Sequence, residues 1–314
     1  MSEIIPLGRW VDQSVHYLLD HDANTFDAIG KTIESFAALI EYTLQAIPMW
    51  ALMAFFIGIG LWRVGWRFAI FATLALLLIY ATGFWNQTVI TLGLTLSSTL
   101  ISLAFGVPLG IWTARNRHVA MVVRPILDLM QTMPAFVYLI PAAMLFGLGH
   151  VPGILSTVIF AMPPAVRLTS LGIRHVNREI VEAGQAFGCT PWQLLYKVQF
   201  PNALPSIMQG VNQTIMLALS MVIIASMVGA GGLGNDVLAS IQRLDVGLGF
   251  ESGLSVVLLA IILDRITESF GRSPGTAGAP RFAGLRSVMR IRPERPVAQR
   301  CTDGEQHAAA KTPS

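Results

Sequence analysis

A glycine-rich run, Gly229-Ala-Gly-Gly-Leu-Gly234, is the segment whose residue types most suggest nucleotide chemistry. Glycine-rich loops bind phosphates through backbone N–H groups, but a phosphate loop also carries the lysine of the pattern G-x-x-x-x-G-K-[ST]. This run has no lysine and follows no predicted strand, and the full pattern is absent from the chain. We therefore expect a turn at the end of an apolar helix, and no ATP hydrolysis by this chain.

The residues that could bind a metal or act as nucleophiles are scattered. Histidine occurs near the ends of apolar segments, in loops and towards the termini, at His16, His21, His118, His150, His175 and His307. The two cysteines, Cys189 and Cys301, suggest neither a disulfide framework nor a metal site. The sequence thus predicts no catalytic, metal or cofactor-binding residue, which argues against a membrane-bound enzyme.

The composition places these residues in a membrane protein. Of 314 residues, 54% are hydrophobic and only 12% are charged, whereas a soluble domain has about 25% charged residues. A bilayer core of about 30 Å needs about 20 helical residues per crossing, and several apolar runs reach that length. We predict an all-α, polytopic membrane protein. Its seven predicted spans are 46–62, 68–85, 88–113, 126–148, 151–167, 209–233 and 248–264.

The distribution of arginine and lysine predicts the orientation. Basic residues concentrate in every second loop, including Arg63 and Arg67 in the first and Arg115 and Arg117 after the third span. Basic loops remain on the cytoplasmic side. We therefore expect the N-terminus outside and the C-terminus inside, which an odd number of spans allows. Asp128 follows Arg124 by four residues, so we also expect an i,i+4 ion pair there.

The long loop 177–205 has the pattern of two short helices joined by a tight turn. Asn177 can cap a first helix running to about Phe187, and Gly188 suits the left-handed residue after a helix end. Thr190 can cap a second helix, with Pro191 in its first turn and Gln193 in the capping-box position. We expect Pro201 to stop this helix. Such a rigid protrusion can transmit force from a soluble motor, although a partner-free interfacial hairpin fits the local pattern equally well.

The same loop resembles the EAA loop of bacterial ABC-importer permeases. That motif runs Glu-Ala-Ala, three residues, Gly, nine residues, then Ile-x-Leu-Pro. Here the corresponding residues are Glu182, Ala183, Gly184, Gly188, Val198, Phe200 and Pro201. The Gly and Pro spacing matches, whereas Gly184, Val198 and Phe200 replace Ala, Ile and Leu. A glycine within the first helix is expected to weaken it by up to about 1 kcal/mol relative to alanine.

The resemblance extends over residues 88 to 271. The stretches 106–112, 127–141, 210–214 and 218–227 are similar to the permease subunit of glycine betaine/proline betaine uptake systems. Choline permeases share much of this pattern. The resemblance implies an ATP-driven importer subunit in the bacterial inner membrane, with choline uptake as the alternative substrate. An ion-coupled secondary transporter, the alternative from another class, usually has an ionisable residue near mid-membrane, and no predicted span carries one.

The family resemblance also implies the partners. Two permease subunits would form the pathway, two cytoplasmic ATPase subunits would bind the ATP, and an external solute-binding protein would deliver the substrate; nucleic acid has no role. The loop helix that begins near Glu182 would seat in the ATPase, with Gly188 fixing the turn. Ala183, Gly184, Val198 and Pro201 complete this predicted coupling loop.

Uncharged polar residues interrupt two of the apolar spans. Asn212, Gln213, Thr214 and Ser220 lie in the sixth span, and Ser97, Ser98, Thr99 and Ser102 lie in the third. They could line the translocation pathway or form hydrogen bonds between helices, which in membranes average below about 1 kcal/mol. Both interpretations stay open from sequence alone.

The two ends of the chain have compositions unlike the permease region 46–271. Residues 1–45 carry an amphipathic helical pattern from Phe26 onward, which fits a helix on the outer membrane surface or one that docks on a partner. Residues 272–314 are rich in Arg, Pro, Gly and Ala. We predict a disordered basic cytoplasmic tail there, which could touch anionic membrane lipid or could be solvated and only reinforce the topology.

Overall fold

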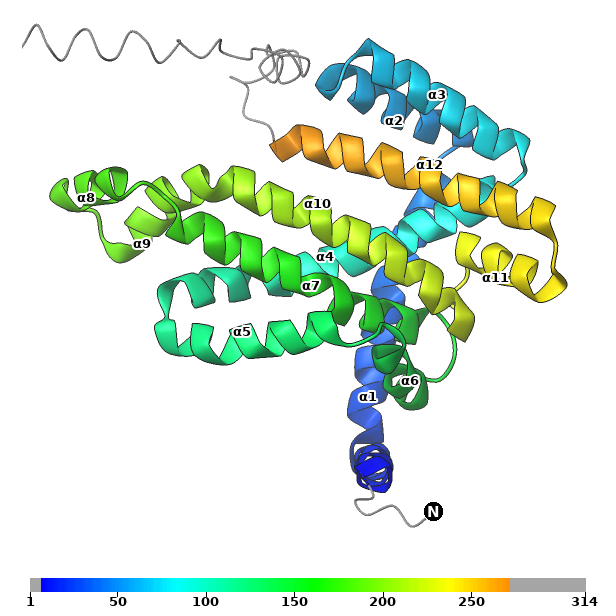
Figure 1. Cartoon of the computed structure of the whole chain (residues 1–314), viewed down its shortest axis with the longest axis horizontal. Helices are drawn as coiled ribbons and strands as arrows, with labels where there is room; N and C mark the ends of the chain where they lie inside the picture. The colour runs from blue at the N-terminus through cyan, green and yellow to red at the C-terminus, as the bar shows by residue number, and fades with distance from the viewer. Residues whose placement is uncertain (1–6, 272–314) are drawn as a thin grey trace, which may run out of the picture. The chain divides into compact units, whose positions relative to one another are not determined.

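The computed structural model describes residues 7–271, with side chains from residue 24 onward, and this part of the chain is helical without a strand (Figure 1). The tail predicted for 272–314 lies outside the described residues. A π-helix, η1 (Leu194–Gln199), and a 3₁₀-helix, η2 (Ser226–Val228), connect some of the α-helices. The α-helices are α1 (Leu7–Ala46), α2 (Met49–Arg63), α3 (Trp66–Ala81), α4 (Trp85–Arg115), α5 (Arg117–Thr132), α6 (Phe136–Phe146), α7 (His150–Arg174), α8 (Arg178–Ala186), α9 (Pro191–Gln193), α10 (Phe200–Ala225), α11 (Leu233–Arg243) and α12 (Val246–Gly271).

Within residues 7–271, four unbroken helical runs are long and apolar enough to cross a membrane: α4, α7, the continuous run Pro191–Val228, and α12. Two bent pairs, α1 with α2 and α5 with α6, raise the number of candidate spans to six. The count of seven predicted spans is therefore higher than helix length and composition support. The segment 46–62 corresponds to α2, with 15 residues, and 68–85 to α3, with 16, which are about 22–24 Å long at 1.5 Å per residue.

Helix α7 continues beyond the predicted end of its span at residue 167. The apolar run ends at Arg167, but the helix extends to Arg174 because both arginines have partners on neighbouring helices. Arg167 pairs with Asp128 of α5, and the Arg174 guanidinium donates to the carbonyl of Thr113 at the end of α4. Asp128 is thus bound to α7, and the i,i+4 pair predicted with Arg124 is wrong.

The predicted span 126–148 is broken by a sharp bend. Helices α5 and α6 meet at 96° across residues 133–135, where Pro134 lies in the break. Proline disfavours the helical conformation of the residue before it, and Met133 is extended, with ψ of 138°. Hydrophobicity alone could not separate the two helices because the run stays apolar across the break.

Helices α4 and α10 both pack on α7 through glycine and other small residues, and they also contact each other. Figure 1 shows α7 and α10 running side by side. A Cβ atom added to Gly110 of α4 would lie 2.7 Å from the Thr169 Cβ and 2.8 Å from the Val166 carbonyl oxygen. On α7, a Cβ at Gly172 would lie 2.8 Å from the Ser206 Cβ of α10. Close backbone approach of this kind holds helices together in membranes, where water does not drive association.

The predicted amphipathic helix near the N-terminus is confirmed as α1. Its segment Asn24–Ala46 meets α2 at 96°, and Figure 1 shows it crossing the direction of α7, α10 and α12. It packs on α4, α6 and α7: Ala37 is buried, and Phe26 lies edge-on to Phe146 with ring centres 6.0 Å apart. One face of α1 is therefore fixed to the helical core, while a position on the membrane surface stays a prediction.

The glycine-rich run forms a turn, as predicted. Gly229, Gly231 and Gly232 have positive φ angles, and the turn joins η2 to the start of α11 at Leu233. The backbone N–H of Leu233 donates to the Thr91 hydroxyl at 2.8 Å. This hydrogen bond ties the turn to α4.

Candidate functional site: the 177–199 hairpin and the exposed face of α10

The first arm of the hairpin is α8, and local chemistry determines both its ends. The Asn177 side chain accepts a hydrogen bond from the Glu179 N–H at 3.1 Å, as a helix cap does. At the other end Gly188 has φ of +78°, while the Cys189 N–H donates to the Gly184 carbonyl and the Gly188 N–H to the Gln185 carbonyl. These two bonds form a Schellman motif, which turns the chain sharply. The predicted helix and glycine turn are confirmed.

The second arm starts with the predicted capping box. The Gln193 N–H donates to the Thr190 hydroxyl at 3.4 Å, and the Gln193 side chain accepts from the Thr190 N–H at 3.0 Å. The prediction that Pro201 stops this helix is wrong, because α9, η1 and α10 form one continuous run from Pro191 to Val228.

The π-helical turn explains why Pro201 is tolerated. Proline has no N–H, and its ring crowds the carbonyl of the preceding helical turn. In η1 the Phe200 N–H instead reaches back five residues to the Leu195 carbonyl. The wider turn makes room for the proline ring, and Pro201 then occupies the first turn of α10. The hairpin is therefore joined rigidly to a long apolar helix.

The two arms pack against each other at Gly184. A Cβ at this position would lie 2.8 Å from the Leu194 Cδ1 and 3.5 Å from the Val198 Cγ2. Glycine therefore allows close contact between α8 and η1, which offsets the helix weakening expected from its substitution for alanine. Val198 contributes to the same contact. The predicted coupling residues Gly184 and Val198 therefore hold the two arms of the hairpin together.

The hairpin is also fixed to the ends of α4 and α7. The Arg115 guanidinium of α4 lies over the Trp192 ring at 5.0 Å from its centre. Leu195 is buried in a small apolar cluster with Ile173 of α7 and Ile207 of α10. A load on the hairpin would therefore reach three long helices directly.

The tip of the hairpin exposes large aromatic side chains. Phe187 is 89% exposed, Trp192 72% and Tyr196 75%. Glu182, Ala183, Gly188 and Pro201 are exposed as well. Aromatic residues left uncovered by the chain make the hairpin tip a candidate surface for a partner. Sequence analysis missed Arg115, Phe187, Trp192 and Tyr196; aromatic residues within a polar, capped loop were the signal that could have found the last three.

The polar residues predicted for the pathway separate into two groups. Thr214 is buried and donates to the Gly210 carbonyl of its own helix, and the Asn212 amide donates to Asp264 of α12 at 2.9 Å. Gln213 and Ser220 lie on the exposed face of α10. In α4, Ser97, Ser98, Thr99 and Ser102 are all buried. Of the candidates, only Gln213 and Ser220 face away from the described helices.

The sequence profile of one family matches residues 106–273: "Binding-protein-dependent transport system inner membrane component". The chain belongs to this family. It is therefore a multi-pass inner-membrane transport permease and not an enzyme, and the alternatives of a secondary transporter and a membrane-bound enzyme are discarded.

Named relatives cover nearly the whole chain. The glycine betaine/carnitine transport permease protein GbuB of Listeria monocytogenes is 48% identical over 272 residues, spanning 85% of this chain and 96% of GbuB. The glycine betaine/proline betaine transport system permease protein ProW of Escherichia coli is 45% identical over 280 residues, spanning 89% and 79%.

The fold is shared with a solved transporter. An inward-facing structure of the MetNI methionine ABC transporter matches with a TM-score of 0.52 at 23% identity, covering 58% of this chain and 94% of the matched chain. At this identity the likeness shows the fold alone. The predicted all-α ABC-permease fold is confirmed.

Proposed function

We infer that this chain is the membrane-spanning permease subunit of an ATP-driven importer for glycine betaine, proline betaine or a related quaternary ammonium solute. The observation that carries the transport role is the 177–199 hairpin, which is joined to α4, α7 and α10 and ends in uncovered aromatic residues. The named substrates of GbuB and ProW support the solute class.

The uncovered tip fits a separate cytoplasmic ATPase as its partner. Glu182 and Ala183 lie exposed on α8, and Phe187 and Trp192 project beside the turn. ATP is bound and hydrolysed by that subunit, and its domain movements act on the hairpin. Because the hairpin continues into α10 without a flexible break, the movement tilts or shifts that helix.

The exposed face of α10 fits a pathway shared with a second copy of the chain. Gln209, Gln213 and Ser220 follow one another at intervals of four and seven residues, which places them along one side of the helix. This polar stripe lies on a predominantly apolar helix. We place it at the pathway between two permease copies, which receive solute from an external binding protein.

The orientation follows from the basic loops. The hairpin lies on the cytoplasmic side, the C-terminus is also cytoplasmic, and α1 lies at the outer surface of the bacterial plasma membrane. The 96° angle between α1 and α2 suits a helix that lies along the membrane before the chain enters it.

Reconstitution tests the function. Proteoliposomes would contain this chain with its ATPase, with ATP inside and the binding protein outside, and would be assayed for uptake of radiolabelled glycine betaine. We expect ATP-dependent uptake that unlabelled proline betaine suppresses more strongly than choline. Stronger suppression by choline would reassign the substrate, and uptake without ATP or the ATPase would refute the importer assignment.

A further inference from the structure

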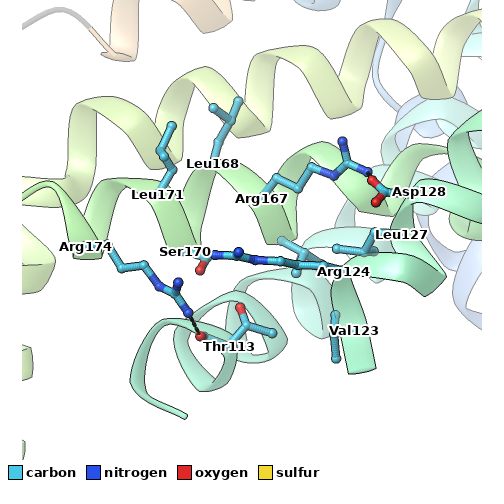
Figure 2. Close-up of a pocket in the computed structure, with 11 residues that line it drawn as sticks. Thr113, Val123, Arg124, Leu127, Asp128, Arg167, Leu168, Ser170, Leu171 and Arg174 are labelled. Carbon is cyan, nitrogen blue, oxygen red and sulfur yellow. Dashed lines mark hydrogen bonds and ion pairs between the residues drawn. The ribbon is translucent and has the colours of Figure 1, made fainter. Parts of the chain in front are cut away.

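A cavity of about 460 Å³ opens between the end of α4, α5 and the second half of α7 (Figure 2). Its walls include the apolar side chains of Val123, Leu127, Val166 and Leu171. Three arginines line the same cavity: Arg124 from α5 and Arg167 and Arg174 from α7. This cavity is separate from the exposed face of the hairpin and from the polar stripe of α10.

The charges in the cavity are unbalanced. Arg167 pairs with Asp128, the only acidic residue among the described residues that line the cavity, and Arg174 donates to the neutral Thr113 carbonyl. Arg124 has no ion pair among residues 24–271, and Figure 2 shows it reaching across the cavity towards Ser170. Three guanidinium groups therefore face one carboxylate, and the excess positive charge favours an anionic ligand.

The position of the cavity indicates the kind of anion. Arg174 ends α7, and Arg167 lies seven residues, or about 10 Å, further into the apolar helix. The outward face of α5 leaves Met121, Val122 and Leu129 more than half exposed. Such a face suits contact with acyl chains, while the charged end of α7 at Arg174 suits contact with headgroups. A ligand with an anionic head and an apolar tail matches both parts of the cavity.

We propose that this cavity binds an anionic phospholipid of the leaflet on the hairpin side. Its phosphate is held by Arg124 and Arg174, with Arg167 nearby, and an acyl chain lies against Val123 and Leu127. Guanidinium groups bind phosphate oxygens with two parallel hydrogen bonds, which an ammonium group cannot do. Basic pockets between membrane helices are a known kind of site for anionic headgroups.

The bound lipid would have a mechanical consequence. Arg174 lies three residues before Asn177, where the hairpin begins, and it also contacts the end of α4. A phosphate shared by Arg124 and Arg174 would join α5 to the base of the hairpin. The lipid would thus fix α5 against the helices that receive the load.

Native mass spectrometry of the purified full chain, titrated with phosphatidylglycerol or with phosphatidylcholine, tests the site. We expect preferential retention of phosphatidylglycerol, weakened about fivefold by Arg124→Gln and further by Arg124→Gln with Arg174→Gln. Arg124→Lys should restore only part of the affinity. Arg67→Gln removes the same charge from an exposed residue in the first turn of α3, outside the cavity, and should change nothing.

Each of the following results would contradict the proposed lipid site. Equal retention by wild type and Arg124→Gln would overturn the proposal, and this variant breaks no ion pair, so misfolding would not obscure the result. An equal loss of phosphatidylglycerol retention in Arg67→Gln would mean that general surface charge, and not this cavity, attracts the lipid. Displacement of the lipid by excess inorganic phosphate would assign the cavity to a free anion. If Arg124→Gln reduced dimer formation and left lipid retention unchanged, a second copy of the chain would be the occupant.

Discussion

The guanidinium carbon of Arg115 lies 5.0 Å from the centre of the Trp192 ring, so the last turn of α4 contacts the start of the second hairpin arm directly. Arg115 also ends the core helix that packs along α7. The hairpin is therefore held by its covalent continuation into α10, by the Leu195 cluster that includes Ile173 of α7, and by this contact with α4.

Removing the guanidinium should weaken force transmission without unfolding the protein. A cation–π contact at an exposed site contributes about 0.5–1 kcal/mol. We expect Arg115→Gln to lower ATP-dependent uptake about two- to fivefold while the chain still copurifies with the ATPase. Arg117→Gln, two residues along, removes the same charge from an exposed residue that has no aromatic partner among the described residues. Equal losses in both variants would show that the Trp192 contact is unimportant.

The glycine turn should be sensitive to backbone conformation alone. A Cβ at Gly188 would meet no atom within 4 Å, yet its φ of +78° costs other residues about 1–2 kcal/mol. Gly188→Ala should therefore loosen the hairpin, which limited proteolysis would detect as faster cleavage near residue 188. Gly253→Ala in α12 also has open space and has no positive φ, so it should leave cleavage unchanged. Unchanged cleavage in Gly188→Ala would contradict the strain argument.

The contact between α4 and α7 should be sensitive to a single methyl group. A Cβ at Gly110 would crowd both Thr169 and the Val166 carbonyl, and a backbone carbonyl cannot move easily. Gly110→Ala should destabilise the protein by about 1–3 kcal/mol, measured by thermal unfolding in detergent. Gly58→Ala in α2, with nothing within 4 Å, is the matched control. A Gly110→Ala protein as stable as the control would show that these helices are less closely packed than described.

Asp236, in the first turn of α11, gives the stability a pH dependence. Its Oδ2 atom is buried without a hydrogen bond, and this burial raises the pKa of the carboxyl above its usual range. The folded state therefore binds the proton more tightly than the unfolded state. The stability from this group is fully present below the unfolded pKa of about 3.9, and it is lost as the pH rises through the raised native pKa.

The variant Asp236→Asn tests this pH dependence. It should gain stability relative to wild type above the native pKa and lose that advantage in acid, as measured by unfolding across a pH series. Asp245→Asn provides the control, because Asp245 is exposed and its carboxylate accepts from the Leu248 N–H at 3.1 Å. If the difference in stability between wild type and Asp236→Asn did not vary with pH, the role assigned to burial of this carboxyl would be refuted.

Local signals in the sequence predicted the hairpin well. The caps at Asn177 and Thr190 each involve a backbone N–H at most three residues away, and the turn at Gly188 depends on the backbone freedom of glycine itself. All three were confirmed. Features that depend on distant residues could not be predicted. Pro201 was expected to end a helix, but the π-turn accommodates it, and Asp128 pairs with Arg167, 39 residues away, instead of Arg124.

The candidate pathway residues also depend on contacts with distant residues, which the sequence could not predict. Asn212 and Gln213 are adjacent in sequence and were grouped together, yet one contacts Asp264 while the other faces away from the described helices. Which side of a uniformly apolar helix packs inward depends on partner helices, and hydrophobicity carries little information about that choice. The small residues Gly110, Gly172 and Gly210 mark the packed faces and were the signal that could have helped.

Site-directed crosslinking tests the central claim most directly. In a chain whose cysteines are replaced by serine, Ala183→Cys would place a thiol on exposed α8, and Val246→Cys would place one at the start of α12, where the residue is 84% exposed. In intact cells, we predict that residue 183 crosslinks to the ATPase and resists a membrane-impermeant thiol reagent, whereas residue 246 reacts with the reagent and does not crosslink. Labelling of residue 183 from outside, or no ATPase crosslink to it in an assembled complex, would contradict the account.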